Sequence, residues 1–503
     1  MDNILLLTDS YKVSHWKQYP AKTTTVYSYF ESRGDKYDEV VFFGLQYYVK
    51  KYLVGEQVTK AKIDEAERFY GEHFPPGFEF NRAGWEHILE NHGGPLPLRI
   101  KAAPEGTVVG AKNVLMTVEN TDPACFWLTN FVETLLVQVW YPMTVATHSR
   151  EQKKVVAKYL DVTGDVAGLG FKLHDFGFRG VSSVETAGVG SCAHLVNFLG
   201  TDTVAGLVVA KDYYGAESAA GFSIPASEHS TITSWGESQE VDAMRNMLEV
   251  YPAGLVACVS DSYDIFKACG DLWGTQLKDA VLARDGCLVV RPDSGDPPST
   301  AMRVLAILGD KFGKEKNDKG YWVLDSHVRV IWGDGIDYEM ICAVLSTLAD
   351  AGWSADNIGF GSGGGLLQKL NRDTQKCAFK CSELRKADGS VTLVYKDPIT
   401  DKGKQSKKGR MTVEKGADGK LTTGTEGKGD PAKDEMIEVY KMAYEFMHSS
   451  CLSMLMEQNE SPLDSNKLSL AMLEMRNVFV TQFDDDMVPN DYLNPNMVSV
   501  VKS

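Results

Sequence analysis

The fold is decided by the stretch from residue 255 to residue 370, which repeats one pattern four times: LVACVSDSYDIF (255–266), CLVVRPDSGDP (287–297), VRVIWGDGID (328–337) and NIGFGSGGGLLQKL (357–370). Each copy is a short apolar β-run followed by Asp, Gly or Ser. The copies start roughly 30 to 40 residues apart, which leaves room for a strand, a loop and a returning helix, as parallel β/α units require. The sequence therefore predicts an α/β fold built on a parallel sheet or barrel.

The carboxyl ends of these strands hold the residues that can do chemistry. In parallel sheets and barrels the active site lies beyond the carboxyl ends of the strands. Here each end presents carboxylates, an arginine or bare backbone amides. This pattern indicates an enzyme that handles a phosphorylated and metal-bound substrate.

Composition narrows the class of protein. At 503 residues the chain is too long for one ordinary core, so two or three domains are expected. A hydrophobic content of 43% with 24% charged residues is ordinary for a globular protein. The net charge of −16 argues against a general nucleic-acid binder, which needs a basic face. The basic run KGKQSKKGR (402–410) is an exception that, taken alone, is equally consistent with a solvated loop.

Cysteine usage and hydropathy favour a soluble cytoplasmic protein. The nine cysteines are odd in number and include no C-x-x-C pair, which favours reduced thiols. Cys377 and Cys381 could form a metal pair, but no nearby Cys or His set completes a zinc site. The N-terminus lacks a signal-peptide pattern. The most apolar long stretch (126–147) is interrupted by polar residues and a proline, so a membrane span is not expected.

Shorter patterns predict the elements outside the repeats. Period-two alternation predicts strands at 23–34, 38–53 and within 96–121, and helix is predicted from about 124 to 160. After the repeats, a short strand is expected at 391–397 and a helical pattern begins at about 433.

The glycine-rich copy, GSGGGLLQKL (361–370), is the sharpest local signal. Its glycines follow a buried strand and precede a helix, so bare amides and a helix start could bind a phosphate. The alternative is a flexible turn at a helix start. The spacing matches neither the Walker loop nor the dinucleotide fingerprint.

Carboxylates and an arginine follow the other three strands. Arg291 can bind a pair of phosphate oxygens, and Asp293 beside it can hold sugar hydroxyls or Mg²⁺. Asp261, Asp264 and Asp334 stand at neighbouring strand ends and would converge in a barrel. A single Asp after a strand is more often a helix N-cap, but Asp at three successive strand ends favours a site.

Two earlier segments add histidines and aromatic residues. In KLHDFGFRG (172–180), the simple structural interpretation pairs His174 with Asp175, and periodicity alone assigns Phe176 and Phe178 to the core. In PASEHSTIT (225–233), His229 follows a carboxylate and precedes hydroxyls, so it is the better functional candidate.

The motifs, taken in chain order, resemble those of the nicotinamide phosphoribosyltransferases. The matching segments are TDSYKVSHWKQYP (8–20), KLHDFGFRG, GTDTVAG (200–206), EHSTIT (228–233), VSDSYDI (259–265), RPDSG (291–295), GDG (333–335) and FGSGGGLLQKL (360–370). The resemblance covers about residues 3–430. Beyond about 430 there is no good match, and the acidic, Met-rich tail is peculiar to this chain.

The resemblance implies a type II phosphoribosyltransferase fold, with an irregular α/β barrel domain plus a mixed-sheet α+β domain built from N- and C-terminal segments. The barrel would span 161–383, and the mixed-sheet domain would combine 1–160 with 384–503, which includes the divergent tail. The resemblance also implies a head-to-tail homodimer with shared active sites. The reaction would convert nicotinamide and phosphoribosyl pyrophosphate to nicotinamide mononucleotide and pyrophosphate, with Mg²⁺ as cofactor and ATP as coupled co-substrate. No nucleic acid and no membrane are expected as partners.

Residue roles are also implied by the resemblance. Phe176 would stack on one face of the pyridine ring and Tyr11 of the partner subunit on the other. Asp202 would accept from the carboxamide and repel the carboxylate of nicotinate. Arg291 would contact the carboxamide side and the diphosphate, and Arg179 would also contact the diphosphate.

The catalytic set implied by the resemblance comprises His229, Asp293, Arg291 and Asp261. His229 would contact the diphosphate and become phosphorylated during coupled ATP hydrolysis, and Asp261 and Asp293 would hold the metal. The ribose-binding positions would be Asp293, Gly333 and Asp334. The 5′-phosphate would be bound by Gly363, Gly364, Arg372, Lys380 and the partner's Arg33. Lys404, in the basic run, would be a further lysine that faces a phosphate. Ala378 stands where the family often has a serine, so one phosphate hydrogen bond would be lost.

Three alternatives remain beside this hypothesis. A nicotinate phosphoribosyltransferase of the same fold is the nearest, and Asp202 speaks against it. A barrel aldolase or metal hydrolase would use Asp261, Asp293 and Asp334 as ligands, but a strand-end lysine and a His-rich cage are lacking. A non-catalytic role is disfavoured by the intact set of charged residues.

Overall fold

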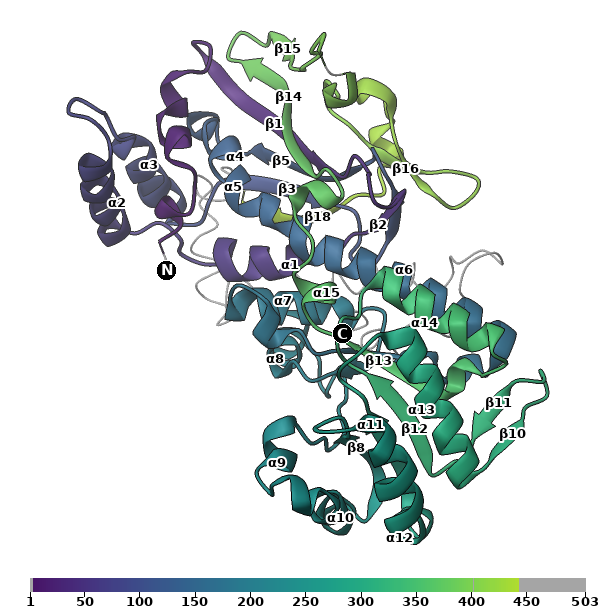
Figure 1. The fold of residues 1–503 in the computed structure, drawn as a ribbon. Helices are drawn as coiled ribbons and strands as arrows, with labels where there is room; N and C mark the ends of the chain where they lie inside the picture. Colours follow the sequence, from purple (N-terminus) through teal and green to yellow (C-terminus); the bar gives the residue numbers. More distant parts are fainter. Residues whose placement is uncertain (1–2, 401, 443–503) are drawn as a thin grey trace, which may run out of the picture. The chain divides into compact units, whose positions relative to one another are not determined.

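The computed structural model describes residues 3–400 and 402–442, which form two compact units (Figure 1). Among the described residues, the first unit combines 3–147 with 370–442 and the second comprises 148–369. The ranges read from the sequence divide at 160 and 383 instead. No helix in the described part of the chain is long and apolar enough to cross a membrane.

The first unit is organised around a sheet that joins the two ends of the described chain. Its strand order is β15-β14-β1-β5-β3-β18, and neighbouring strands pair antiparallel. The bounds are β1 (Thr23–Glu31), β3 (Leu98–Ala102), β5 (Val114–Asn120), β14 (Ala378–Lys386), β15 (Val391–Leu393) and β18 (Ile437–Lys441). The expectation of a sheet domain built from N- and C-terminal segments is therefore confirmed.

Two predictions of secondary structure in this unit are wrong. Only β2 (Glu39–Val41), which pairs with β4 (Val108–Gly110), is a strand in 38–53; the rest turns helical at α1 (Leu45–Tyr48). Gly44 ends the extended run with a φ of 108°, and a Cβ there would lie 2.2 Å from the Pro142 ring. The helical pattern from 433 is also wrong where it can be checked, because 437–441 is strand β18; its remainder lies outside the described residues.

The second unit is a curled parallel sheet with the order β7-β6-β13-β12-β9-β8. Its strands are β6 (Leu173–Asp175), β7 (Gly200–Thr201), β8 (Ala253–Val259), β9 (Asp285–Arg291), β12 (Val328–Trp332) and β13 (Ile358–Ser362). All four sequence repeats thus form parallel strands, as predicted. The segment 222–227 joins the two edges of the sheet, since Phe222 bridges to Gly200 and Ala226 bridges to Ala257. The result is an irregular barrel.

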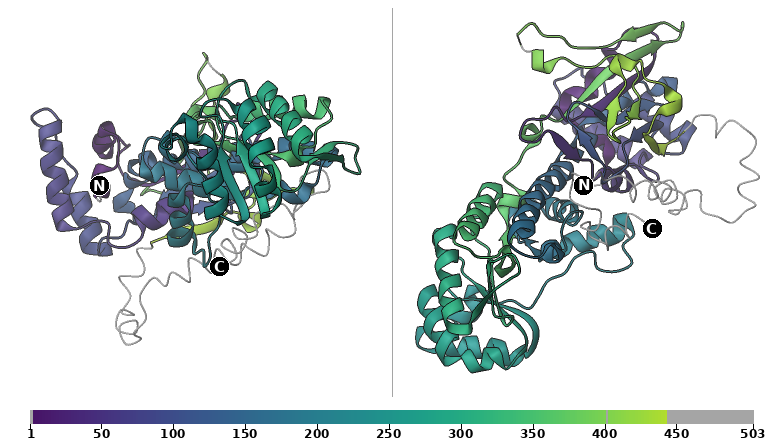
Figure 2. Two further views of the ribbon diagram at one scale, coloured as in Figure 1. Left: turned by 60° about the horizontal axis from the view of Figure 1, so that its bottom comes forward. Right: turned by 90° about the vertical axis from the view of Figure 1, so that its right-hand side faces the viewer.

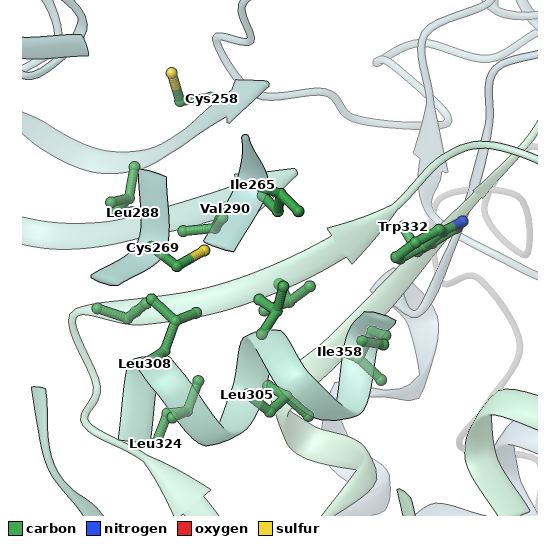
Figure 3. Packing of buried hydrophobic residues seen from close by; sticks show 14 of the residues in the cluster. Cys258, Ile265, Cys269, Leu288, Val290, Leu305, Leu308, Leu324, Trp332 and Ile358 are labelled. Carbon is green, nitrogen blue, oxygen red and sulfur yellow. The ribbon is translucent and has the colours of Figure 1, made fainter. Parts of the chain in front are cut away.

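Helices cover the outside of this barrel. Figures 1 and 2 show the teal and green helices of the unit lying along its parallel strands. Leu305 and Leu308 of α13 (Pro297–Phe312) pack toward Leu288, Val290 and their neighbours on the sheet (Figure 3). Fully burying each such side chain contributes about 1.5–3 kcal/mol. The alternate residues of the same strands, including Val289, point to the inner face and form a small separate cluster.

A buried carboxylate joins two histidines in the first unit. Nε2 of His87 and Nε2 of His92, both on α3 (Arg82–His92), lie 2.6 and 2.8 Å from the same oxygen, Oδ2 of Asp122. The amide of Asn91 donates to Nδ1 of His87 and also to the carbonyl of His87, which assigns the ring proton to Nε2. His87 therefore faces Asp122 as a donor, so the cluster is a hydrogen-bonded junction rather than a preformed metal site.

We expect Asp122→Ala to lower the free energy of unfolding by about 2–4 kcal/mol, because two imidazoles lose their acceptor and Ala124 loses its N-cap. Burial alone raises the pKa of Asp122, but the bonds from His92 and His87 outweigh it and leave the pKa below its ordinary value. This stabilisation is therefore present above the unfolded pKa of about 3.9 and is lost as pH falls through the folded pKa.

Urea unfolding of the wild type and the variant at pH 7, 5 and about 3.5 checks this expectation. The difference between the two proteins should be similar at pH 7 and pH 5 and should begin to narrow at about pH 3.5, below the unfolded pKa. Asp64→Asn, which alters an exposed carboxylate beside Arg82, is the control and should change little. Equal stability of wild type and Asp122→Ala at pH 7 would contradict the assignment.

Candidate active site

Asp261 and His229 form a pair at the carboxyl end of β8. Oδ1 of Asp261 lies 3.0 Å from Nε2 of His229, and Oδ2 accepts the hydroxyl of Ser294. The Asp261 side chain is 3% exposed, whereas that of His229 is 46% exposed. A capping box between Glu228 and Thr231 starts α9 (His229–Thr233) and fixes the backbone of His229. A buried carboxylate thus orients an accessible imidazole, as nucleophilic or acid–base chemistry requires.

Arg291 and Asp293 form a fork-like ion pair at the next strand end. The guanidinium of Arg291 donates to both oxygens of Asp293, at 3.3 and 2.8 Å. Its Cζ also lies 5.9 Å from the centroid of the Phe176 ring. A Cβ on Gly333 would lie 3.1 Å from Asp293 and 3.4 Å from Phe176, so a side chain there would crowd the group. The structure therefore brings together four sequence-predicted residues.

The other strand-end aspartates divide into caps and site candidates. The carboxylate of Asp264 accepts from two backbone amides at the start of α11 (Ile265–Lys267). Asp296 and Asp337 each accept one backbone amide and cap α13 and α14 (Tyr338–Asp350). Asp264 is therefore a helix cap rather than part of the convergent set predicted for it. Asp334 is exposed, and its carbonyl accepts from the Trp332 indole at 2.7 Å.

The glycines after β13 have two different reasons to be glycine. A Cβ on Gly361 would lie 1.9 Å from the Phe176 ring, and one on Gly365 would lie 2.2 Å from a backbone oxygen. Gly363 and Gly364 have room for a Cβ, with nearest atoms at 3.4 and 4.0 Å. Packing alone does not require glycine at these two positions, which agrees with close approach of a ligand to their backbone. Because α15 (Gly364–Leu367) is a single turn, amides rather than a helix dipole would bind the ligand.

Phe176 forms part of the inner wall of the barrel. Its ring packs against the inner cluster of Ala257, Cys287, Val289 and Ile331, and its backbone N–H donates to the carbonyl of Ser362 at 3.0 Å. The core assignment for Phe178 is wrong, because this side chain is 41% exposed. Arg179, in the same short turn, is exposed as well.

Asp202 and His174 have partners that the sequence reading did not provide. The carboxylate of Asp202 accepts from the hydroxyl of Ser223, which lies in the segment that closes the barrel. His174 does not pair with Asp175 as predicted; its Nε2 lies 3.0 Å from the carbonyl of Phe171. Burial lowers the pKa of His174, while the nearby Asp202 raises it. Ser223 was missed, because its segment has no periodic pattern.

A basic cluster in the first unit contains Arg33, Arg372 and Lys380. Burial lowers the pKa of Lys380, Glu133 raises it, and Arg33 and Arg372 lower it, so these groups are electrostatic neighbours. Nε of Arg33 donates to Glu31 at 2.9 Å, whereas its buried Nη2 has no hydrogen-bond partner in the described part of the chain. A bare buried donor of this kind suits an anion.

Other predicted residues of the first unit are accessible. Tyr11 is 59% exposed and is the second residue of a short helical segment, η2 (Ser10–Lys17), while Lys404 is exposed in the basic run. Two other cations of that run are anchored: Lys407 pairs with Glu31, and Arg410 pairs with Glu119 and Glu383. The interpretation as a purely solvated loop is therefore wrong, since its ion pairs tie the run to the sheet.

Of the described cysteines, Cys287 lies in the apolar inner wall of the barrel. The eight described cysteines form no disulfide, and six of them are buried. Within residues 3–400 and 402–442, the single group of three or more potential metal-binding side chains is the Asp122 junction, so Cys377 and Cys381 do not assemble a metal site.

Comparison with known proteins identifies relatives along most of the chain. Residues 171–443 match the model of the nicotinate phosphoribosyltransferase (NAPRTase) family, and residues 3–100 match the nicotinamide phosphoribosyltransferase N-terminal domain. A nicotinamide phosphoribosyltransferase of Xanthomonas campestris is 53% identical over 417 residues, covering 82% of this chain and 88% of the relative. One of Acinetobacter baylyi is 32% identical, covering 92% of this chain and 99% of the relative.

Solved structures agree at the level of the fold. A nicotinate-nucleotide pyrophosphorylase from Pyrococcus furiosus superposes with a TM-score of 0.53 at 16% identity, covering 92% of this chain and 97% of that one. Human nicotinic acid phosphoribosyltransferase gives a TM-score of 0.50 at 16% identity, covering 85% and 82%. Together with the motifs and the strand-end geometry, these matches show that the chain belongs to the nicotinate and nicotinamide phosphoribosyltransferase family.

Proposed function

We propose that this protein transfers the 5-phosphoribosyl group of phosphoribosyl pyrophosphate to nicotinamide, giving nicotinamide mononucleotide and pyrophosphate, a salvage step toward NAD. The relatives named nicotinamide phosphoribosyltransferase support the reaction. The observation that carries the choice of nicotinamide over nicotinate is Asp202, an exposed carboxylate held by Ser223.

The pyridine ring would lie against Phe176. The inner wall of the barrel is apolar there, which favours a flat uncharged ring over a carboxylate. Stacking on Phe176 and on Tyr11 of the partner subunit would contribute about 0.5–1.5 kcal/mol per ring pair beyond burial. Asp202 would accept from the carboxamide NH₂ and would face the carboxylate of nicotinate with like charge.

Departure of the diphosphate is the step that needs most stabilisation. Breaking the C1′–O bond leaves positive charge on the ribose and negative charge on the leaving group, while the ring nitrogen attacks C1′. Arg291 is already oriented by Asp293 and would stabilise the diphosphate without reorganising, with Arg179 and His229 beside it. Asp334 and Gly333 would hold the ribose hydroxyls, and the amides of Gly363 and Gly364 would bind the 5′-phosphate.

Mg²⁺ fits the carboxylates that are present. It is usually bound by one or two carboxylates together with substrate phosphates and water. Asp261 and Asp293 would be these carboxylates, although both already accept hydrogen bonds from His229, Ser294 and Arg291. When bound, the ion would neutralise part of the diphosphate charge.

Arg33, Arg372 and Lys380 would act as one phosphate grip. All three belong to the first unit of one chain, and Arg33 and Arg372 both act electrostatically on Lys380, so a single chain would supply them together. We place them, with Tyr11, in the active site of the other subunit of a head-to-tail homodimer. Lys404 would face the phosphates from the anchored basic run.

His229 would couple the transfer to ATP hydrolysis. With Nε2 held by Asp261, Nδ1 is the nitrogen with a lone pair, and its attack on the γ-phosphorus of ATP would release ADP. The phosphohistidine would then lose its phosphoryl group to water. The exposed side chain of His229 agrees with access of a nucleotide.

The reaction itself is tested by supplying Mg²⁺, phosphoribosyl pyrophosphate and equal nicotinamide and nicotinate, and by identifying the mononucleotide formed. We expect nicotinamide mononucleotide from the wild type. In Asp202→Ala, removal of the like charge should raise the nicotinate-to-nicotinamide ratio of kcat/KM about 10- to 100-fold. Ser223→Ala keeps the charge and should change the ratio much less. An unaltered ratio in Asp202→Ala would remove the basis for the choice of substrate.

The role of His229 is tested by mass spectrometry after incubation with ATP. We expect a phosphoryl group on His229 in the wild type, labile in acid and absent from His229→Ala, together with loss of the ATP-dependent gain in product. Asp261→Asn should slow phosphorylation about 10- to 100-fold. The neutral amide would orient the imidazole less well than the carboxylate and would not stabilise the positive charge that develops on the ring. ADP release that persists in His229→Ala would refute the phosphohistidine.

The shared site is tested by mixing two inactive variants, Arg33→Ala and Asp293→Ala. If each active site combines the first unit of one chain with the second unit of the other, re-associated mixed dimers hold one intact site. Random exchange should then restore about a quarter of the wild-type activity, since half of the dimers are mixed and each has one of two sites. No recovery, with exchange verified by mass, would show that the site lies within one chain.

A further inference from the structure

Asp175 is a buried carboxylate that the mechanism above does not use. It is the last residue of β6 and is 0% exposed. Its Oδ1 accepts the backbone N–H of Gly177 at 2.7 Å, and its Oδ2 accepts the hydroxyl of Thr201 at 3.3 Å. Burial raises the pKa of Asp175 above its ordinary value, although hydrogen bonds with Ser191, Gly177, Thr203 and Thr201 act to lower it. A carboxylate is a costly group to bury, so its contacts indicate what it is retained for.

The backbone of the same residue reaches the neighbouring strand end. The carbonyl of Asp175 accepts the N–H of Asp202 at 2.9 Å. The hydroxyl of Thr201 is bonded in turn to Ser191 at 3.1 Å and accepts the N–H of Thr203 at 2.9 Å. The residues on both sides of Asp202 are thus held by a network that begins at Asp175.

The side chain of Asp175 also shapes the turn that follows β6. Its bond to Gly177 closes a tight turn of the Asx type, in which the ring of Phe176 projects onto Gly361. Gly177 has no space for a side chain, because a Cβ would lie 2.6 Å from Leu367 and 3.0 Å from Oδ1 of Asp175. Phe176 and Asp202 are therefore placed by one carboxylate.

We propose that Asp175 is a positioning residue, which locks the ring-stacking Phe176 and the amide-accepting Asp202 into one arrangement and so sets affinity for the neutral pyridine amide. The proposal rests on the proposed function of these two residues. Misplacement of a binding group by about 1 Å can cost on the order of a hundredfold in rate, so a rigid support for both contacts has a measurable effect.

The test compares Asp175→Ala, Asp175→Asn and Thr201→Val in steady-state assays with nicotinamide and phosphoribosyl pyrophosphate varied in turn. Asp175→Ala should raise the KM for nicotinamide about tenfold or more. The KM for phosphoribosyl pyrophosphate should also rise, but by a several-fold smaller factor, because many other groups bind the phosphates. Asparagine retains an acceptor for Gly177 and should recover most of the affinity. Thr201→Val removes the bonds of the Thr201 hydroxyl to Asp175, Ser191 and Thr203 but leaves the bond between Asp175 and Gly177, so its effect should be intermediate. It replaces Asp175→Ala if that variant does not fold.

Asp356→Ala is the matched control. Asp356 is a half-buried carboxylate of the same unit that accepts the N–H of Asp165 at 3.0 Å and lies outside the proposed site. Loss of the Asp356 carboxylate should lower Tm, but it should not raise the KM for nicotinamide more than the KM for phosphoribosyl pyrophosphate. The proposal is overturned if Asp175→Ala changes both KM values and Tm in the manner of Asp356→Ala, or if Asp175→Asn recovers nothing. A wild type that forms no nicotinamide mononucleotide would instead overturn the proposed function, before any variant is compared.

Discussion

Parallel, in-register pairing of the barrel strands is the constraint on which the site depends. Leu255 pairs with Cys287, Val328 with Leu288, and Val330 with Ile358. Because parallel strands share one direction, their last residues reach the same edge at nearly the same height. The His229–Asp261 pair, the Arg291–Asp293 pair and the Gly363 amides are thereby gathered from more than 130 residues of chain. Successive side chains of each strand point to opposite faces of the sheet, so one set packs against the helices and the other faces the interior, where the ligand would bind.

The four repeated strands could be predicted from the sequence, because a short apolar run that ends in Asp or Gly is a local signal. Elements whose conformation depends on contacts with distant parts of the chain could not be predicted. The segment 222–227 joins the barrel edges through isolated bridges, and its sequence has no alternation of apolar and polar residues that would predict a strand. The contact of Ser223 with Asp202 was therefore not predicted. Residues 437–441 have a helical pattern but pair with β3, where a free sheet edge outweighs the propensity.

Single-residue roles were ambiguous for a physical reason. An N-cap and a ligand-binding carboxylate both stand just after a strand and just before a helix. Asp261 and Asp264 are only three residues apart, so the sequence alone could not show which of them is the cap and which belongs to the site. The structure separates them, because Asp264 accepts backbone amides and Asp261 accepts an imidazole and a hydroxyl. The glycine run was ambiguous in the same way. Gly361 makes room for Phe176, whereas Gly363 has room to spare.

Two cations of the proposed site, Arg291 and Arg33, share one design, since each is held by a carboxylate of the same chain. Arg291 is paired with Asp293, and Arg33 is paired with Glu31. Each pair lowers the net positive charge available to a phosphate, which weakens ground-state attraction. In return, the side chains are fixed before substrate arrives, so little rotamer entropy is lost on binding and no dipoles need to reorganise as the diphosphate gains charge. For a protein with a net charge of −16, this local preorganisation rather than overall charge must attract and stabilise an anionic substrate.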